Sequence, residues 1–265
     1  MNEAELKGIR DWFELYADRY CRENGCRESV RAMMVLKREH SRRVSQEAAT
    51  LASDLGWNRS DQITSEALGL LHDAGRFSQM AEFGTFRDVE SVNHALRGVQ
   101  VVQESKVLDR CRGGRREQIL DGIRLHNGLR VPAGLSAGSV PFLHLIRDAD
   151  KLDIFEIFLD AFRNNRIHDY PEIAHHVDLE GPVSPELAAE VRAGRIPSYR
   201  MIRSLCDWKL LQVSWVFDLH YRPSCRRVGE RRVLERLRDS LPDTAEIAGT
   251  FEGARAHLEM RCRTG

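Results

Sequence analysis

An all-α fold is what this sequence predicts, organised as a helical bundle that continues into a helical extension at the carboxyl end. Apolar residues recur at steps of three or four over most of the 265 residues, which is the spacing of an amphipathic helix. No stretch shows the alternation of apolar and polar residues that indicates a strand. The chain has no repeat, low-complexity tract or clear linker, so we expect one helical domain over residues 1–265.

The first two helices are predicted over residues 4–22 and 28–55, where apolar residues follow one another at helical spacing. His40 lies on the apolar stripe of the second helix, which is an unusual position for a titratable side chain. Gly56 is expected to end this helix, because glycine adopts the left-handed conformation found after many helices.

A third helix is expected to begin in the polar segment 58–61 and to end near His72 and Asp73, after a strongly apolar run. Residues 76–90 contain two Gly/Phe clusters and mixed charges, so we expect a loop there. The remaining helices are predicted to begin at Ser91, to span 115–126, to run from Pro141 to about residue 161, and to span 185–193, 198–220 and 228–240.

Composition limits the classes of function. Lys and Arg together number 40, as do Asp and Glu, so the net charge is zero, which argues against a dedicated nucleic-acid-binding protein. No apolar segment approaches the roughly 18 residues that cross a bilayer, and the acidic amino terminus lacks the order of a signal peptide. The six cysteines are scattered without a C-x-x-C pair, as is typical of reduced thiols. We expect a cytoplasmic protein without membrane association.

Six polar residues lie at or beside the apolar faces of successive predicted helices. One such histidine is more often a core residue with an ordinary hydrogen-bonding partner. Several are hard to satisfy separately, because an unpaired buried polar group is costly, whereas one metal centre satisfies all of them. Nitrogen and oxygen ligands without thiolate suit one or two ions of Mn, Fe, Co, Ni, Zn or Mg. The expected ligands are His40, His72, Asp73, His94, His126 and Asp150.

A His-Asp dipeptide by itself is weak evidence, since a short motif also arises by chance. The chain contains a second one, His168-Asp169, in an irregular segment without apolar periodicity. We expect that pair on the surface, whereas the first pair ends an apolar helix.

The order of the six residues resembles that of the HD-domain superfamily of metal-dependent phosphohydrolases, which has a helical fold. In that family the first His, the His-Asp pair and a distal Asp bind one divalent ion. The two additional histidines resemble the branch with two-metal sites, which includes the HD-GYP phosphodiesterases and di-iron oxygenases. This chain has no Gly-Tyr-Pro run, and Leu125-His126-Asn127-Gly128 stands where HD-GYP proteins have a His-His pair. The matching motifs are His72-Asp73-Ala74-Gly75-Arg76 and Ala149-Asp150-Lys151-Leu152-Asp153.

The resemblance covers about residues 28–165, the expected metal-binding core, and leaves 166–265 as the helical extension. The distal ligand can be Asp148, Asp150 or Asp153, and we favour Asp150 because it matches the Ala-Asp-x-Leu pattern of the family.

The resemblance implies hydrolysis of a phosphoester in a nucleotide or small phosphorylated metabolite. His40, His72, Asp73 and Asp150 would hold one ion and His94 and His126 a second, with Asp73 bridging and a metal-activated hydroxide attacking phosphorus. A di-iron oxygenase and a non-catalytic nucleotide-binding module are the alternatives, and a homo-oligomer is possible. Besides Asp73, the expected catalytic residues are Arg76 and Lys151. The expected substrate-binding residues are Lys37, Arg76 and Arg87.

Overall fold

The computed structural model describes residues 1–22, 28–164, 166–167 and 177–263. Within these residues the chain is helical, as predicted, and its only β contact is an isolated bridge between Asp178 and Ser204. The chain divides into two compact units, Met1–Asp153 and Ile154–Gly265. This division falls inside a long helix and lies before residue 166, where the helical extension was expected to begin. That residues 1–265 form one domain stays a prediction. The pair His168-Asp169 and Cys26 lie outside the described residues.

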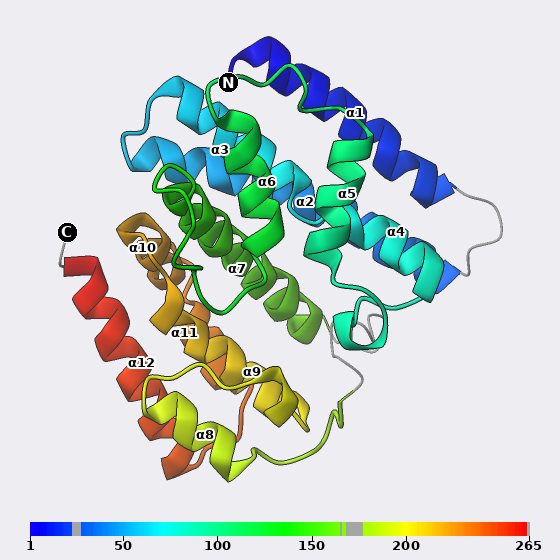
Figure 1. The fold of residues 1–265 in the computed structure, drawn as a ribbon. Helices are drawn as coiled ribbons and strands as arrows, with labels where there is room; N and C mark the ends of the chain where they lie inside the picture. The colour runs from blue at the N-terminus through cyan, green and yellow to red at the C-terminus, as the bar shows by residue number, and fades with distance from the viewer. Residues whose placement is uncertain (23–27, 165, 168–176, 264–265) are drawn as a thin grey trace. The chain divides into compact units, whose positions relative to one another are not determined.

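Among the residues that the structure describes, the first unit contains six α-helices, the 3-10 helix η1 (Asp88–Glu90) and the first part of a seventh α-helix. Their arrangement is drawn in Figure 1. The helices predicted over 4–22, 28–55 and 115–126 are confirmed to within one residue at each end. The bounds are α1 Glu3–Arg22, α2 Glu28–Asp54, α3 Arg59–Leu71, α4 Ala74–Phe83, α5 His94–Glu104, α6 Arg115–Leu125 and α7 Val140–Arg163.

Helices α2 and α3 pack closely because Gly69 lies directly against the backbone of α2. A Cβ atom at this position would lie 2.6 Å from the Cα of Ser45, which leaves no room for any side chain. His40 and Val44 belong to the buried face of α2. The close contact therefore brings His72, at the end of α3, next to His40.

The prediction of a loop over residues 76–90 is wrong for residues 76–83, because Ala74–Phe83 form helix α4. Asp73, with φ −102° and ψ 16°, lies between α3 and α4. Gly75 lies inside α4, where a Cβ would be 2.1 Å from the carbonyl oxygen of His94, so it permits close packing against α5. Gly84 ends α4 with φ +69°. Composition does not distinguish a contact glycine from a capping glycine, which explains the error.

Within residues 177–263, the second unit contains five α-helices and two 3-10 helices that follow the end of α7. The helix predicted over 198–220 is interrupted, because Ser204 begins a new helix with a capping box that it forms with Asp207. The helix predicted over 228–240 is divided at Arg232, which has φ +51°. The bounds are α8 Pro185–Arg192, η3 Tyr199–Met201, α9 Leu205–Ser214, η4 Trp215–Asp218, α10 Arg222–Glu230, α11 Val233–Asp239 and α12 Ala245–Arg263.

Helix α12 was not among the predicted elements. Its buried residues Ile247, Phe251, Ala254 and Leu258 have helical spacing, but exposed charged residues between them weaken the pattern. The cysteines within the described residues are free thiols, in agreement with the sequence.

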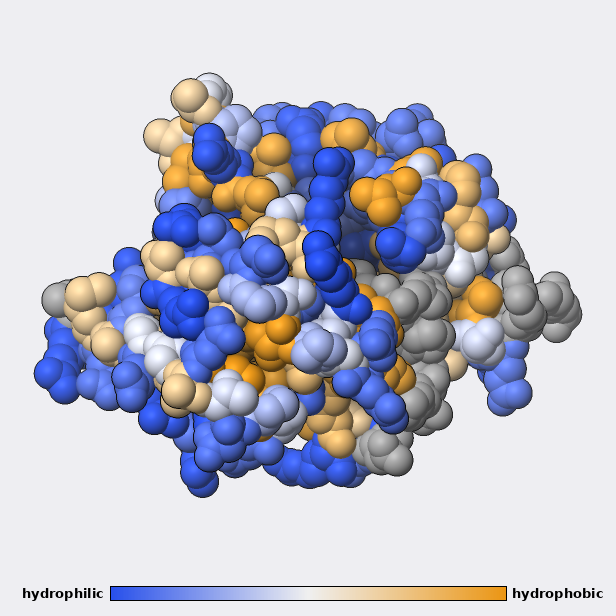
Figure 2. Space-filling model, turned by 90° about the horizontal axis from the view of Figure 1, so that it is seen from below, coloured by the Kyte–Doolittle hydropathy of each residue, from blue (hydrophilic) through white to orange (hydrophobic). Residues whose placement is uncertain are grey.

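None of the helices that the structure describes is long and apolar enough to cross a membrane. Hydrophilic residues make up most of the face shown in Figure 2, and hydrophobic residues are grouped among them.

Candidate metal centre

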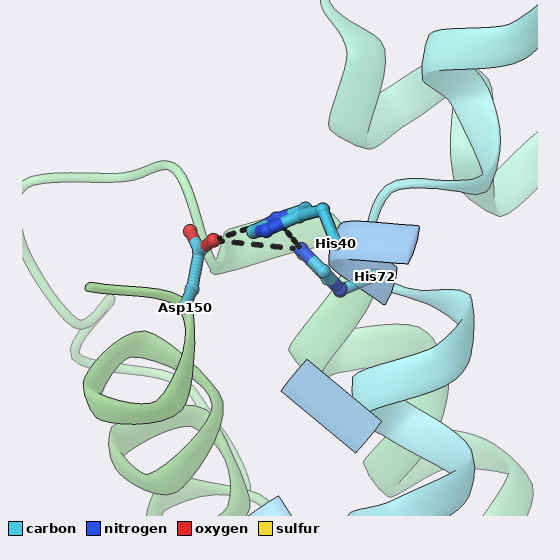
Figure 3. Close-up of side chains that lie close together, drawn as sticks. All are labelled: His40, His72 and Asp150. Atoms are coloured by element: carbon cyan, nitrogen blue, oxygen red, sulfur yellow. Dashed lines mark hydrogen bonds and ion pairs between the residues drawn. The ribbon is translucent and has the colours of Figure 1, made fainter. Parts of the chain in front are cut away.

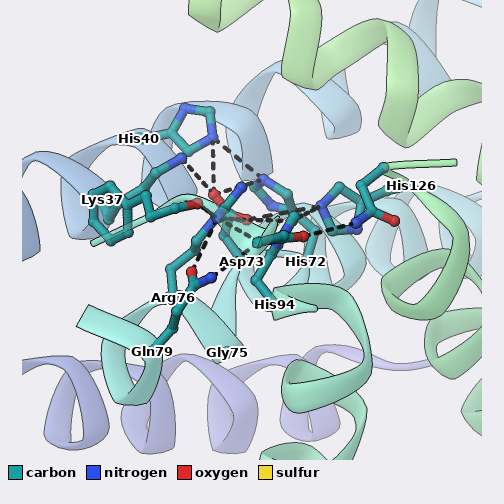
Figure 4. Close-up of polar contacts among 12 residues, drawn as sticks. Lys37, His40, His72, Asp73, Gly75, Arg76, Gln79, His94 and His126 are labelled. Carbon is teal, nitrogen blue, oxygen red and sulfur yellow. Dashed lines mark hydrogen bonds and ion pairs between the residues drawn. The ribbon is translucent and has the colours of Figure 1, made fainter. Parts of the chain in front are cut away.

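The six predicted ligands come together inside the first unit, each from a different helix or helix end; Figure 4 labels the four histidines and Asp73, and Figure 3 labels Asp150. The four histidines and Asp73 are buried, and Asp150 has a side chain that is 20% exposed. His40 comes from α2, His72 from the C-cap of α3, Asp73 from the junction with α4, His94 from the start of α5, His126 from the C-cap of α6, and Asp150 from α7.

His40, His72 and Asp150 form the first half of the centre (Figure 3). The Nε2 atoms of the two histidines are 3.3 Å apart. Asp150 Oδ1 lies 3.1 Å from Nε2 of His40 and 3.6 Å from Nε2 of His72. Three ligand atoms therefore face one small volume.

His94 and His126 form the second half, and their Nε2 atoms are 3.1 Å apart. The ligand atoms of His72, Asp73 and His126 also lie within 4.8 Å of one another. Two nitrogen ligands on one ion, each at about 2.0–2.1 Å, are themselves about 3 Å apart. The spacing in both histidine pairs fits coordination to an ion, so the residues present suit a divalent metal.

Asp73 lies between the two halves and presents one carboxylate oxygen to each. Its Oδ2 is 3.5 Å from Nε2 of His40 and 3.6 Å from Nε2 of His72. Its Oδ1 is 3.6 Å from Nε2 of His94 and 3.7 Å from Nε2 of His126. Among the residues that the structure describes, no other carboxylate contacts both histidine pairs.

Each of the four histidines is held through its Nδ1 atom, and an acceptor at Nδ1 leaves the Nε2 lone pair available to a metal. In each half one histidine is held by a carboxylate and the other by a backbone carbonyl. The distances are 2.7 Å for His40 to Asp153 Oδ2, 2.7 Å for His72 to Gly69 O, 2.8 Å for His94 to Asp88 Oδ2, and 2.8 Å for His126 to Ile123 O.

His40 in the first half and His94 in the second have pKa values shifted in opposite directions. Burial and Lys37 oppose protonation of His40, but hydrogen bonds with Asp150 and Asp153 raise its pKa above the usual value. Burial, reinforced by the charge of Arg76, lowers the pKa of His94 to about 3.

The central carboxylates are ionised in spite of their burial. Burial alone would raise the pKa of Asp73, but Lys37 and the neighbouring histidines hold it well below the usual range. Burial likewise opposes ionisation of Asp150, and hydrogen bonds from the first-half histidines lower its pKa. Ionised carboxylates and neutral imidazoles are the forms that bind metal.

Two of the predicted substrate-binding residues lie beside Asp73. Lys37 Nζ is 2.7 Å from Oδ2 and Arg76 Nε is 3.5 Å from Oδ1, and the ring of Phe86 lies 5.7 Å from Lys37 Nζ and 5.6 Å from Arg76 Cζ. The Arg76 hydrogen bonds are all donated by Nη1, to Gln79, the Phe86 carbonyl and Asp88.

Arg87, which was predicted to bind substrate, and Lys151, which was predicted to be catalytic, have different surroundings. Arg87 forms an ion pair with Glu90 on the 3-10 turn η1, Asp88–Glu90. Lys151 follows Asp150 on α7, about 100° further around the helix, and is half-buried.

Of the three candidates for the distal ligand, Asp150 is the one that faces the Nε2 atoms of the first half. Asp153 instead accepts a hydrogen bond from His40 Nδ1 and pairs with Arg43 at 2.6 and 3.0 Å. Asp148 is buried but belongs to neither group of potential ligands.

Asp88, Gln79 and Arg43 were not among the site residues predicted from the sequence. Asp88 lies in the segment that was expected to be an ordinary loop, and its pairing with His94 over six residues has no periodic signature. Arg43 lies three residues after His40, and this helical spacing was the available signal.

A separate cavity of about 870 Å³ lies beside α6, lined by residues that include Arg116, Asp121 and Arg124 and by part of the loop 132–139. It contains none of the six predicted ligands.

Comparison with protein families finds the HD domain over residues 38–154. Residues 38–154 therefore form an HD domain, and this domain is similar to those of the HD-domain superfamily of metal-dependent phosphohydrolases. The matched segment agrees with the resemblance expected over about 28–165. Comparisons with curated proteins and with solved structures gave no match.

Proposed function

We propose that this protein is a two-metal phosphohydrolase that cleaves a phosphoester of a nucleotide or small phosphorylated metabolite. The observation that carries the proposal is the position of Asp73, whose two oxygens face two different histidine pairs. A carboxylate in this position can bind one ion through each oxygen, as in two-metal hydrolases. The HD domain over residues 38–154 supports hydrolysis as the reaction.

His40, His72 and Asp150 would hold one ion, and His94 and His126 the other. When bound, such ions acidify coordinated water and neutralise charge on phosphoryl oxygens. Arg76 is anchored through Nη1, so its Nη2 is available to bind a phosphate oxygen. Lys37 adds a second positive charge on the other side of Asp73. Lys151 and Arg87 remain candidates for weaker contacts with the substrate.

The experiment is metal analysis of the purified protein, followed by a hydrolysis screen of the Mn-loaded protein. Inorganic phosphate is measured for mononucleotides and phosphorylated metabolites, and the ring-opened nucleoside monophosphate is measured for cyclic nucleotides. We expect two ions per chain and turnover of at least one substrate. Asp73→Ala should lose activity. Asp11→Ala is the matched control, because Asp11 is exposed on α1 and pairs with Lys7.

The two alternatives give different results in the same experiment. A di-iron oxygenase with this ligand set would need iron and would stop turning over without O₂, whereas hydrolysis continues. A binding module would bind a nucleotide but would hydrolyse none of these compounds. Full activity of Asp73→Ala would exclude the proposed role of the centre.

A further inference from the structure

The carboxylate of Asp88 contacts side chains from three separate parts of the first unit. Its oxygens lie 2.8 Å from Nδ1 of His94 and 3.1 Å from Nη1 of Arg76. Gln79 donates to Asp88 at 2.9 Å, and Asn127 does so at 3.4 Å. One side chain on a 3-10 turn is thus joined to α4, to the start of α5 and to the residue after His126.

These contacts fix two groups that face the centre. With Nδ1 donating to Asp88, the His94 ring directs Nε2 to His126, 3.1 Å away, and to Asp73. The bond from Arg76 Nη1 to the same carboxylate keeps the guanidinium beside Asp73. Both groups therefore depend on the position of the η1 turn.

We propose that Asp88 is a positioning residue that sets the second half of the centre, orienting His94 for an ion and Arg76 for the phosphate of the substrate. The inference rests on the proposed function, in that His94 and His126 must bind an ion. Asp153 has the corresponding contact with His40 in the first half. Removing the Asp88 carboxylate should accordingly lower the affinity for the second ion and leave the affinity for the first ion unchanged.

The test compares the full-length protein with Asp88→Ala, Asp88→Asn and Glu90→Ala by Mn²⁺ titration. Glu90 is the matched control because it lies on the same turn and pairs with Arg87 at the surface. We expect two ions in the unaltered protein and in Glu90→Ala. In Asp88→Ala the weaker site should lose about 10–100-fold in affinity, the usual effect of removing a carboxylate behind a ligating histidine. Asp88→Asn should lie between, because an amide oxygen still accepts the Nδ1 hydrogen bond.

Electron paramagnetic resonance supplies a readout that a merely structural role would not move. The unaltered protein should show the signal of a coupled Mn²⁺ pair, and Asp88→Ala the signal of an isolated ion at the same metal concentration. Two ions at unchanged affinity in Asp88→Ala, or loss of both with helix content intact, would overturn the inference. If Asp88→Ala does not fold, Asp88→Asn decides by the same criteria. A single ion in the unaltered protein would instead overturn the proposed two-metal function.

Discussion

The two halves of the centre have the same plan but different support. In each half a carboxylate holds one histidine and a backbone carbonyl holds the other. In the first half the carboxylate, Asp153, has a side chain only 6% exposed, lies on the long helix α7 and is fixed by Arg43. In the second half it is Asp88, which is 28% exposed and lies on a three-residue turn.

The halves also differ in the carboxylate ligands that each has in addition to its two histidines. Asp150 supplies a carboxylate to the first half, whereas the second half has Asp73 alone, which it shares. Arg76 adds positive charge near His94. We therefore expect the first ion to bind more tightly and the second to depend on the surroundings of the turn.

Removing a direct ligand should show the difference between the two halves most clearly. Asp150→Ala deletes the carboxylate that is particular to the first half, and His126→Ala deletes one of two imidazoles in the second. We expect Asp150→Ala to lower phosphate release by more than about 100-fold, beyond the effect of changes behind a ligand, and to lose the tight ion. His126→Ala should keep that ion. Metal analysis and initial rates measure the bound ions and the activity of the two variants, and Asp160→Ala on α7 is the control. If Asp150→Ala retains the tight ion, Asp150 is not a ligand of that ion.

Asp153→Asn should have the next largest effect, because it weakens the support of His40. The affinity of the tight ion should fall about 10–100-fold while the weaker site is unchanged. Arg43→Ala should have a smaller effect in the same direction, since its side chain is 44% exposed. Arg42→Ala, which loses contacts with Glu14 and Glu39 instead, is the control. Competition with a metal-sensitive dye measures the affinities, and an effect confined to the weaker site would reverse the comparison.

Removal of metal should lower the midpoint of thermal unfolding. An ion present at about 100 times its Kd stabilises the native state by about 2.7 kcal/mol. Because the first half has the higher expected affinity, the midpoint should rise mainly over the first equivalent of Mn²⁺ returned to the chelated protein. Differential scanning fluorimetry at successive metal ratios tests this. A rise only after the second equivalent would show that the halves fill together.

The smallest expected difference concerns the two arginines near the second half. Arg76→Ala should raise KM about tenfold or more, because it removes a charged hydrogen bond to phosphate. Arg87→Ala should raise KM less, since Arg87 is paired with Glu90. Steady-state kinetics on the substrate found in the screen compares them, and equal effects would mean that η1 itself contacts the substrate.

Much of the fold and the convergence of six side chains could be predicted, because His40 lies on an apolar stripe and the His-Asp pair ends an apolar helix. The outer contacts could not. Asp88 reaches His94 through a turn whose path depends on tertiary packing, and no spacing in the sequence records that path. Helix α4 was missed because Gly75 resembles a helix terminator until α5 lies against it.

The glycines at 69 and 75 also have a consequence for how the His-Asp motif should be understood. Each marks a point where two backbones touch, one beside the first half and one beside the second. An added methyl group at Gly75 would push on the carbonyl of His94 and so shift a ligand without altering any donor atom. The motif therefore supplies ligands and also determines how closely the neighbouring helices pack.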